Sequence, residues 1–167
     1  LIYFLTWRDL KVRYKQTALG ATWAVLQPFL QMVVFSIFFG RLAGLDSEGF
    51  PYPIFNYAAL LPWNYFSYAV STGSNSLVAN ANMITKVYFP RLIVPLSGVF
   101  SGLVDFAVSF IVLIGMMIFY GITPTAAVFF LPLFILLAMV TATGVSLWFS
   151  AMNVAYRDVR YVLPFIV

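Results

Sequence analysis

Residues 92–120 read LIVPLSGVFSGLVDFAVSFIVLIGMMIFY, an apolar run in which Asp105 is the only charged residue. A helix needs about 20 apolar residues to cross a hydrocarbon core of about 30 Å, so this run is long enough to span a membrane. An ionised carboxylate is costly at the middle of a bilayer, and Asp105 should therefore face protein or water. We expect it to be a structural acid, hydrogen-bonded to serines such as Ser101 or to another span. Contact with a transported substrate is the alternative.

Three other segments have the length and composition of membrane spans. The chain is 63% hydrophobic and 8% charged, with a mean hydropathy of +0.97, which indicates that lipid is its main solvent. We expect an all-α membrane protein with four complete spans and the start of a fifth at Tyr161. The four spans are expected at residues 23–40, 54–77, 92–120 and 126–153.

Basic residues are distributed unevenly between the loops. Of the nine, only Arg41 lies outside the segments that precede the first span, join the second to the third, and follow the fourth. The positive-inside rule then predicts a multi-pass protein of the bacterial cytoplasmic (inner) membrane with a cytoplasmic N-terminus. Because these residues lie at span ends, lipid headgroups are better partners for them than nucleic acid. They are Arg8, Lys11, Arg13, Lys15, Lys86, Arg91, Arg157 and Arg160.

Residues 1–20 carry too much charge to span a membrane, but they have a helical repeat. An apolar and aromatic stripe recurs every three or four residues, with basic residues beside it. The stripe consists of Tyr3, Trp7, Leu10 and Tyr14. This pattern predicts an amphipathic helix at the membrane interface, with Asp9 and Arg13 placed to pair one turn apart.

A second amphipathic segment, residues 80–90, lies between the second and third spans. Asn80 and Asn82 can cap a short helix, and Pro90 and Pro95 oppose its continuation. We expect a rigid elbow on the cytoplasmic side that presents a mixed apolar and basic surface to a partner. The residues that it presents are Met83, Ile84, Lys86, Val87 and Tyr88.

The residue types needed for catalysis are largely missing. The sequence has no glycine-rich nucleotide-binding loop, no cysteine and no histidine. We therefore expect no enzyme activity, no metal site and no cofactor bound by this chain.

Aromatic residues make up 19% of the sequence and have two interpretations. They can form a belt at the lipid interface, or they can line a path for sugars, whose C–H faces stack on rings while their hydroxyls bind amide groups. Both interpretations stay open. The candidates for a substrate path are Asn56, Trp63, Asn64, Tyr65, Phe66 and Tyr68.

Three separated motifs occur in a fixed order and on the same predicted side of the membrane. They are WRDLKVRYKQTALGATWAVLQP at residues 7–28, NMITKVYFPRLIVPLS at residues 82–97 and NVAYRDVRYVLP at residues 153–164. Together they resemble the ABC-2 type permeases that export O-antigen, capsule and teichoic-acid polymers. The resemblance covers essentially the whole chain. It implies a single transmembrane domain, residues 1–167, truncated at its C-terminal end.

The resemblance also implies a mode of action. In such a family the permease has six spans, pairs with a second copy of itself, and binds separate ABC ATPase subunits that hold ATP and Mg. Residues 80–90 then correspond to the coupling helix that seats in the ATPase, and residues 1–20 to the interfacial helix beside it. The implied function is ATP-driven export of a lipid-linked or long polysaccharide to the cell envelope. An exporter of small molecules such as drugs, and a non-transporting membrane scaffold, are the alternatives.

Overall fold

A computed structural model of the chain describes residues 2–15, 22–42, 44, 49–156 and 158–167. Every regular element within these ranges is helical, as the sequence predicted. The elements are α1 (Ile2–Lys15), α2 (Trp23–Phe35), the π-helical η2 (Ser36–Leu42), α3 (Tyr52–Ala79), α4 (Ala81–Lys86), α5 (Ile93–Phe119), the 3₁₀-helical η3 (Ala126–Phe130), α6 (Leu131–Ala155) and α7 (Val159–Ile166).

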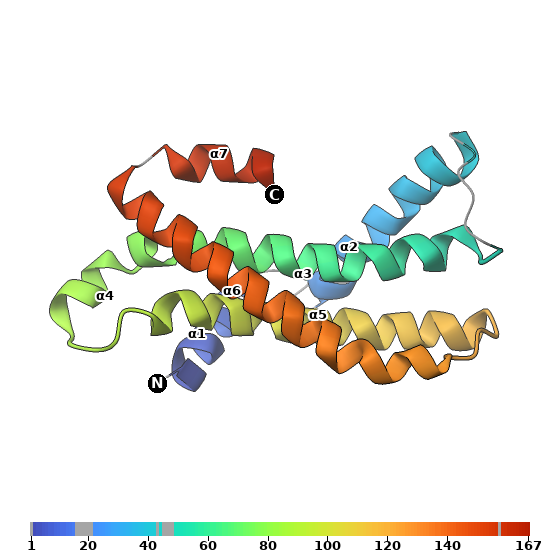
Figure 1. The fold of residues 1–167 in the computed structure, drawn as a ribbon, viewed down its shortest axis with the longest axis horizontal. Helices are drawn as coiled ribbons and strands as arrows, with labels where there is room; N and C mark the ends of the chain where they lie inside the picture. The colour runs from blue at the N-terminus through green and yellow to red at the C-terminus, as the bar shows by residue number, and fades with distance from the viewer. Residues whose placement is uncertain (1, 16–21, 43, 45–48, 157) are drawn as a thin grey trace.

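The long helices α3, α5 and α6 form the centre of the molecule and run side by side (Figure 1). Helix α2 packs on α3 and diverges from the bundle, and α1 packs across α5. The short helix α4 lies at one end of the long helices, and the loop between α5 and η3 lies at the other (Figure 1).

Small residues allow the central helices to approach closely. A Cβ atom added to Gly73 of α3 would lie 2.6 Å from Cβ of Ser146 on α6. One added to Gly102 of α5 would lie 2.8 Å from the ring of Tyr68 on α3. Interfaces between membrane helices are rich in such residues, because lipid offers little hydrophobic drive and close van der Waals contact must supply the attraction.

A buried amide links α6 to α3. Asn153 is almost fully buried, and its Nδ2 donates to the carbonyl oxygen of Ser74 at 3.1 Å and to Oδ1 of Asn75 at 3.0 Å. An interhelical hydrogen bond of this kind fixes the rotation of one helix against the other, in addition to the packing.

Among the described residues, three helical segments are long and apolar enough to cross a membrane. They are Trp23–Gly40, Ile93–Phe119 and Ala126–Ala155. The helix expected over residues 54–77 is present as α3, but it is less apolar than these three because it carries several serine and asparagine side chains.

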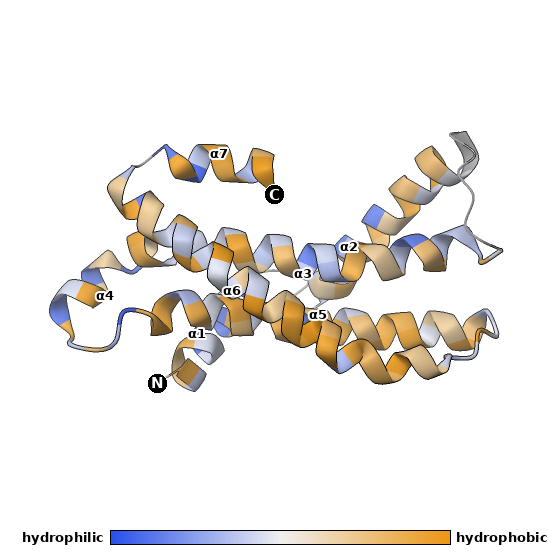
Figure 2. Ribbon diagram, viewed as in Figure 1, coloured by the Kyte–Doolittle hydropathy of each residue, from blue (hydrophilic) through white to orange (hydrophobic). Residues whose placement is uncertain are grey.

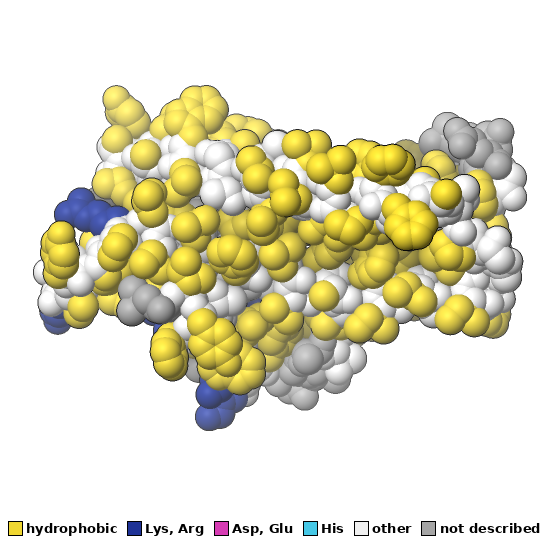
Figure 3. All heavy atoms as spheres, turned by 60° about the horizontal axis from the view of Figure 1, so that its bottom comes forward, with side chains coloured by type: hydrophobic (Ala, Val, Ile, Leu, Met, Phe, Trp, Pro, Cys, Tyr) yellow, Lys and Arg dark blue, Asp and Glu magenta, His cyan; other side chains and the backbone are white. Residues whose placement is uncertain are grey.

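The surface matches a lipid environment. Hydropathy colouring shows apolar residues along the length of α5 and α6, and polar residues concentrated around α4 and the chain that follows it (Figure 2). In the space-filling view, hydrophobic side chains cover most of the visible face, and Lys and Arg side chains gather toward the end that carries α1 and α4 (Figure 3).

Each amphipathic segment contains a helix, but the second helix, α4, ends at Lys86, and residues 87–90 of the expected coupling helix are not helical. Helix α1 covers Ile2–Lys15, and residues 16–20 of the expected interfacial helix lie outside the described residues. Helix α4 begins after Asn80, as expected, but the side chain of Asn80 makes no capping bond. Its Nδ2 instead donates to the carbonyl oxygen of Ser76 at 2.9 Å. The run expected to begin a further span is helical as α7, and Leu163 packs into the core.

Candidate functional site

Helix α1 is held against α5 by polar contacts at two levels. Near the start of α5, Oγ of Ser97 donates to Oδ2 of Asp9 at 3.1 Å. Farther along α5, the guanidinium of Arg13 forms an ion pair with the carboxylate of Asp105, and the hydroxyl of Tyr14 donates to the same carboxylate. The side chain of Asp105 is only 18% exposed, so these two donors supply much of the stabilisation that its charge requires.

Two expectations about these acids were wrong. Asp9 does not pair with Arg13 one turn away, because its Oδ1 accepts a hydrogen bond from the adjacent Arg8 at 2.8 Å. Ser101 does not hold Asp105; its Oγ donates to a backbone carbonyl of its own helix and lies 3.2 Å from the hydroxyl of Tyr68. Serine on a helix readily satisfies its hydroxyl on the preceding turn, which leaves the acid to the longer side chains of α1.

The electrostatic environment keeps both donors of α1 protonated. Burial and the hydrogen bond to Asp105 raise the pKa of Tyr14 well above its usual value. Burial alone would lower the pKa of Arg13, but its interactions with Tyr68, Asp105 and Tyr14 outweigh that effect and raise it. The guanidinium also lies 4.3 Å from the ring centroid of Tyr68, a cation–π contact. Arg13 therefore joins α1, α3 and α5.

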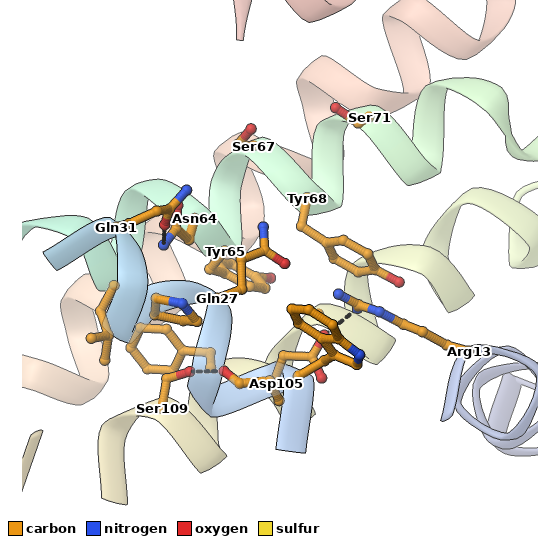
Figure 4. A pocket seen from close by; sticks show the side chains of 16 residues that line it. Arg13, Gln27, Gln31, Asn64, Tyr65, Ser67, Tyr68, Ser71, Asp105 and Ser109 are labelled. Atoms are coloured by element: carbon orange, nitrogen blue, oxygen red, sulfur yellow. Dashed lines mark hydrogen bonds and ion pairs between the residues drawn. The ribbon is translucent and has the colours of Figure 1, made fainter. Parts of the chain in front are cut away.

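A polar cavity of about 310 Å³ lies beside this network, between α2, α3 and α5 (Figure 4). Amide and hydroxyl side chains line it together with the Arg13–Asp105 pair, which is a concentration of polar groups in a largely apolar bundle. The lining residues that Figure 4 labels are Arg13, Gln27, Gln31, Asn64, Tyr65, Ser67, Tyr68, Ser71, Asp105 and Ser109.

Three of the six candidates for a substrate path line this cavity: Asn64, Tyr65 and Tyr68. Nδ2 of Asn64 donates to Oε1 of Gln31 at 2.7 Å, which presents a pair of amides to the cavity. Tyr65 is 4% exposed, and its buried hydroxyl has no hydrogen-bond partner among the described residues. The amide and hydroxyl side chains that line this cavity suit water or a hydroxylated ligand.

The other three candidates lie outside the cavity. Nδ2 of Asn56 is 3.5 Å from the carbonyl oxygen of Met32, at the limit of a hydrogen bond. Trp63 is 51% exposed, and its ring centroid lies 6.2 Å from that of Phe66. Phe66 is half-buried and packs on the core, whereas an exposed ring such as Trp63 on a membrane helix is typical of a lipid-facing anchor.

The contribution of α2 to the cavity was not predicted from the sequence. Gln27 and Gln31 are one helical turn apart within an otherwise apolar span, so they fall on one face of α2. Two amides on one face of a membrane helix are a polar signal that could have been found from the sequence, since such groups face protein or water.

The expected coupling residues all lie on or directly after α4, which projects from the end of the bundle (Figure 1). Those that are most exposed follow the last turn of the helix. Nη2 of Arg8 donates to Oδ1 of Asn80 at 3.1 Å, and Nη1 lies 3.7 Å from Sδ of Met83. Arg8 thus connects α1 to α4. Met83 and Ile84 are half-buried, and Lys86, Val87 and Tyr88 are exposed.

Comparison with known proteins gives consistent results. The family model described as ABC-2 type transporter matches residues 1–167. The chain is 32% identical over 161 residues to the O-antigen export system permease protein RfbA of Klebsiella pneumoniae, a match that covers 96% of this chain and 61% of that protein. It is 31% identical over 163 residues to the protein of the same name from Myxococcus xanthus, covering 98% of this chain and 62% of that protein.

The chain thus spans less than two thirds of the length of these relatives. The family model, however, matches along the full length of the chain. This chain therefore belongs to the ABC-2 type transporter family.

Proposed function

We propose that this chain is the membrane-spanning permease part of an ABC exporter that moves a lipid-linked or long polysaccharide across the bacterial cytoplasmic membrane. The O-antigen, capsule and teichoic-acid polymers are the substrate class. The observation that carries the proposal is the polar cavity inside an apolar helical bundle. Two relatives that are about a third identical and bear the name of O-antigen export permeases support the same class of substrate.

The proposed topology has four spans in this chain, α2, α3, α5 and α6, with α7 beginning a fifth of six. Helix α3 is less apolar than the others because its polar side chains face the cavity and the neighbouring helices, which removes the cost of placing them in lipid. Lys86 on α4 and the basic residues of α1 support a cytoplasmic location for that end of the bundle and for the N-terminus.

In the proposed path, sugar hydroxyls bind the amides and hydroxyls that line the cavity. The Asn64–Gln31 pair is the group best placed to exchange hydrogen bonds with a polyol. Each contact with a ring or an amide is weak. Several weak contacts in series suit a moving polymer, because each contact must also release it.

The proposed energy source is an ABC ATPase subunit that holds ATP and Mg. Its contact is the exposed surface of α4 and the residues that follow, and a second copy of the permease completes the channel. The contacts of Arg8 with Asn80 and Met83 support a mechanical link, because they make a displacement of α4 act on α1.

Reconstitution of the full-length permease with its ATPase in vesicles tests the function. We expect ATP hydrolysis to be stimulated by a lipid-linked cell-envelope glycan, and labelled glycan to be protected from an added glycosidase after transport. Stimulation by hydrophobic drugs with no response to the glycan would support the small-molecule alternative. Normal assembly with no transport of either class would support the scaffold.

A further inference from the structure

A second hollow, of about 530 Å³, lies between α1 and α5. Its α1 wall contains Trp7, Lys11 and Lys15, which are spaced one turn apart and therefore share a face of the helix. Its α5 wall contains Val104 and Val108, which are also one turn apart. Asp105 also lines the hollow, but its carboxylate is paired with Arg13. The hollow is thus a largely apolar groove with two lysines along one side.

The groove opens onto an apolar surface along α5. Val104 is 42% exposed, and Ile111, two turns along the same face, is 67% exposed. That face of α5 contains no charged residue between Val104 and the end of the helix at Phe119. The exposed Ile118 continues the apolar surface. A hydrocarbon chain that starts in the groove can therefore continue along α5 into the core of the bilayer.

Both lysines have charge available for a ligand. The two salt bridges among the described residues are Arg8–Asp9 and Arg13–Asp105, so neither Lys11 nor Lys15 belongs to one. Nζ of Lys11 lies 5.4 Å from the ring centroid of Trp7, which holds the ammonium group at the edge of the groove. Lysine stems that pack on apolar surface while their charges reach headgroup level are typical of lipid contacts.

We propose that this groove binds one anionic phospholipid from the leaflet that contains α1. Its phosphate lies between Lys11 and Lys15, and one acyl chain packs on Val104 and Val108. A lysine near an anionic headgroup is worth roughly a factor of five in affinity, which makes ~25-fold for the pair. The bound lipid fills the gap between the two helices and holds α1 in place.

The chemistry favours a phospholipid over a pyrophosphate-linked carrier. A pyrophosphate is best held by arginine, whose planar guanidinium binds two oxygens at once. The arginines of α1 nearest the groove, Arg8 and Arg13, are already paired with Asp9 and Asp105. Lysine, a compact point charge, suits the single charge of a phosphodiester.

Fluorescence quenching by brominated lipids tests the proposal. The full-length permease is prepared with Trp7 as its sole tryptophan, the others being replaced by phenylalanine, and is placed in vesicles of phosphatidylcholine. Brominated phosphatidylglycerol added as a minor component should quench Trp7 at a mole fraction at least tenfold lower than brominated phosphatidylcholine. Lys11→Gln/Lys15→Gln should abolish that preference. The control variant Arg91→Gln/Arg160→Gln removes the same amount of charge from exposed positions outside the groove. It should retain the preference for brominated phosphatidylglycerol.

A second variant separates binding from folding. Val108→Phe fills the groove without changing charge, and it should reduce quenching by the brominated chain while the oligomeric state stays unchanged. Equal quenching by both lipids, or a preference that survives in Lys11→Gln/Lys15→Gln, would overturn the proposal. So would displacement of the brominated phosphatidylglycerol by an equimolar amount of a polyprenyl pyrophosphate, because the groove would then belong to a carrier lipid.

Discussion

Arg13 of α1 forms an ion pair with Asp105 in the middle of α5, and the same guanidinium packs on the ring of Tyr68 in α3. A helix outside the candidate spans is thereby fixed to the centre of the bundle. Because Arg13 and Asp105 also line the polar cavity, a displacement of α1 would change the shape and charge of that cavity.

The ion pair should contribute to stability. Asp105→Asn and Arg13→Gln should each lower the free energy of unfolding by about 1–3 kcal/mol. This is less than the ~3–5 kcal/mol for breaking a fully buried pair, because the Arg13 side chain is 36% exposed. The double variant should lose less than the sum of the two. Thermal unfolding in detergent measures this, with Arg160→Gln as the exposed control, and strictly additive losses would show that the two residues are not coupled.

Close packing of α3 on α6 gives a second prediction. Gly73→Ala should destabilise the protein by about 1–3 kcal/mol, because the added Cβ would lie 2.6 Å from Cβ of Ser146. Gly115→Ala is the matched control, since a Cβ there meets no atom within 4 Å among the described residues. It should leave stability unchanged or raise it slightly, because alanine favours helix more than glycine does. Similar unfolding midpoints for the two variants would contradict the packing argument.

The length of the apolar runs and the positions of the charged residues were enough to predict the long helices. An apolar run of about 20 residues or more is typical of a membrane-spanning helix and of few other structures. The partner of Asp105 was not predictable in the same way. Arg13 is 92 residues away in the sequence, and only the docking of α1 brings the two together. The need for a partner follows from the desolvation cost of the acid, but its identity depends on tertiary structure.

The inward face of α3 was not predictable either. Tyr65 and Phe66 are adjacent in the sequence, yet Tyr65 lines the cavity while Phe66 pairs with the exposed Trp63. A helical repeat shows which residues share a face. It does not show which face points inward when both faces carry aromatic residues.

Orientation is testable by cysteine labelling, because the chain has no native cysteine. Cysteine at Thr125, in the loop between α5 and α6, should react with a membrane-impermeant maleimide in intact cells. Cysteine at Asn82 or Asp158 should react only after the membrane is permeabilised. Labelling of Asn82 from outside would invert the proposed topology.

The proposed ATPase contact predicts a separation of assembly from insertion. Tyr88→Ala and Lys86→Glu should leave the amount of permease in the membrane unchanged, because both side chains are exposed. They should weaken co-purification of the ATPase, since one aromatic anchor of a small interface can exceed ~2 kcal/mol, or roughly 30-fold in affinity. Tyr156→Ala, an exposed tyrosine at the end of α6, is the control. Normal ATPase recovery with both variants would exclude α4 as the contact.

The cavity predicts which aromatic residues affect transport. Tyr65→Leu removes a ring that lines the cavity and should lower the rate of polymer export per permease molecule, because stacking on a ring is worth about 1–3 kcal/mol. Tyr65→Phe keeps the ring and removes only the unpartnered hydroxyl, so it should have a smaller effect. Asn64→Leu should act in the same direction, since it breaks the amide pair with Gln31.

The Trp63–Phe66 pair, which lies outside the cavity, provides the matched control for that experiment. Trp63→Leu and Phe66→Leu should lower the amount of permease in the membrane and leave export per molecule unchanged, because the ring of Trp63 is exposed, Phe66 packs on the core, and neither lines the cavity. Surface polymer, permease abundance and ATP hydrolysis are measured separately for each variant. If Tyr65→Leu reduces surface polymer only in proportion to lost protein, as the control variants should, then the ring of Tyr65 does not stack on the polymer and serves packing alone.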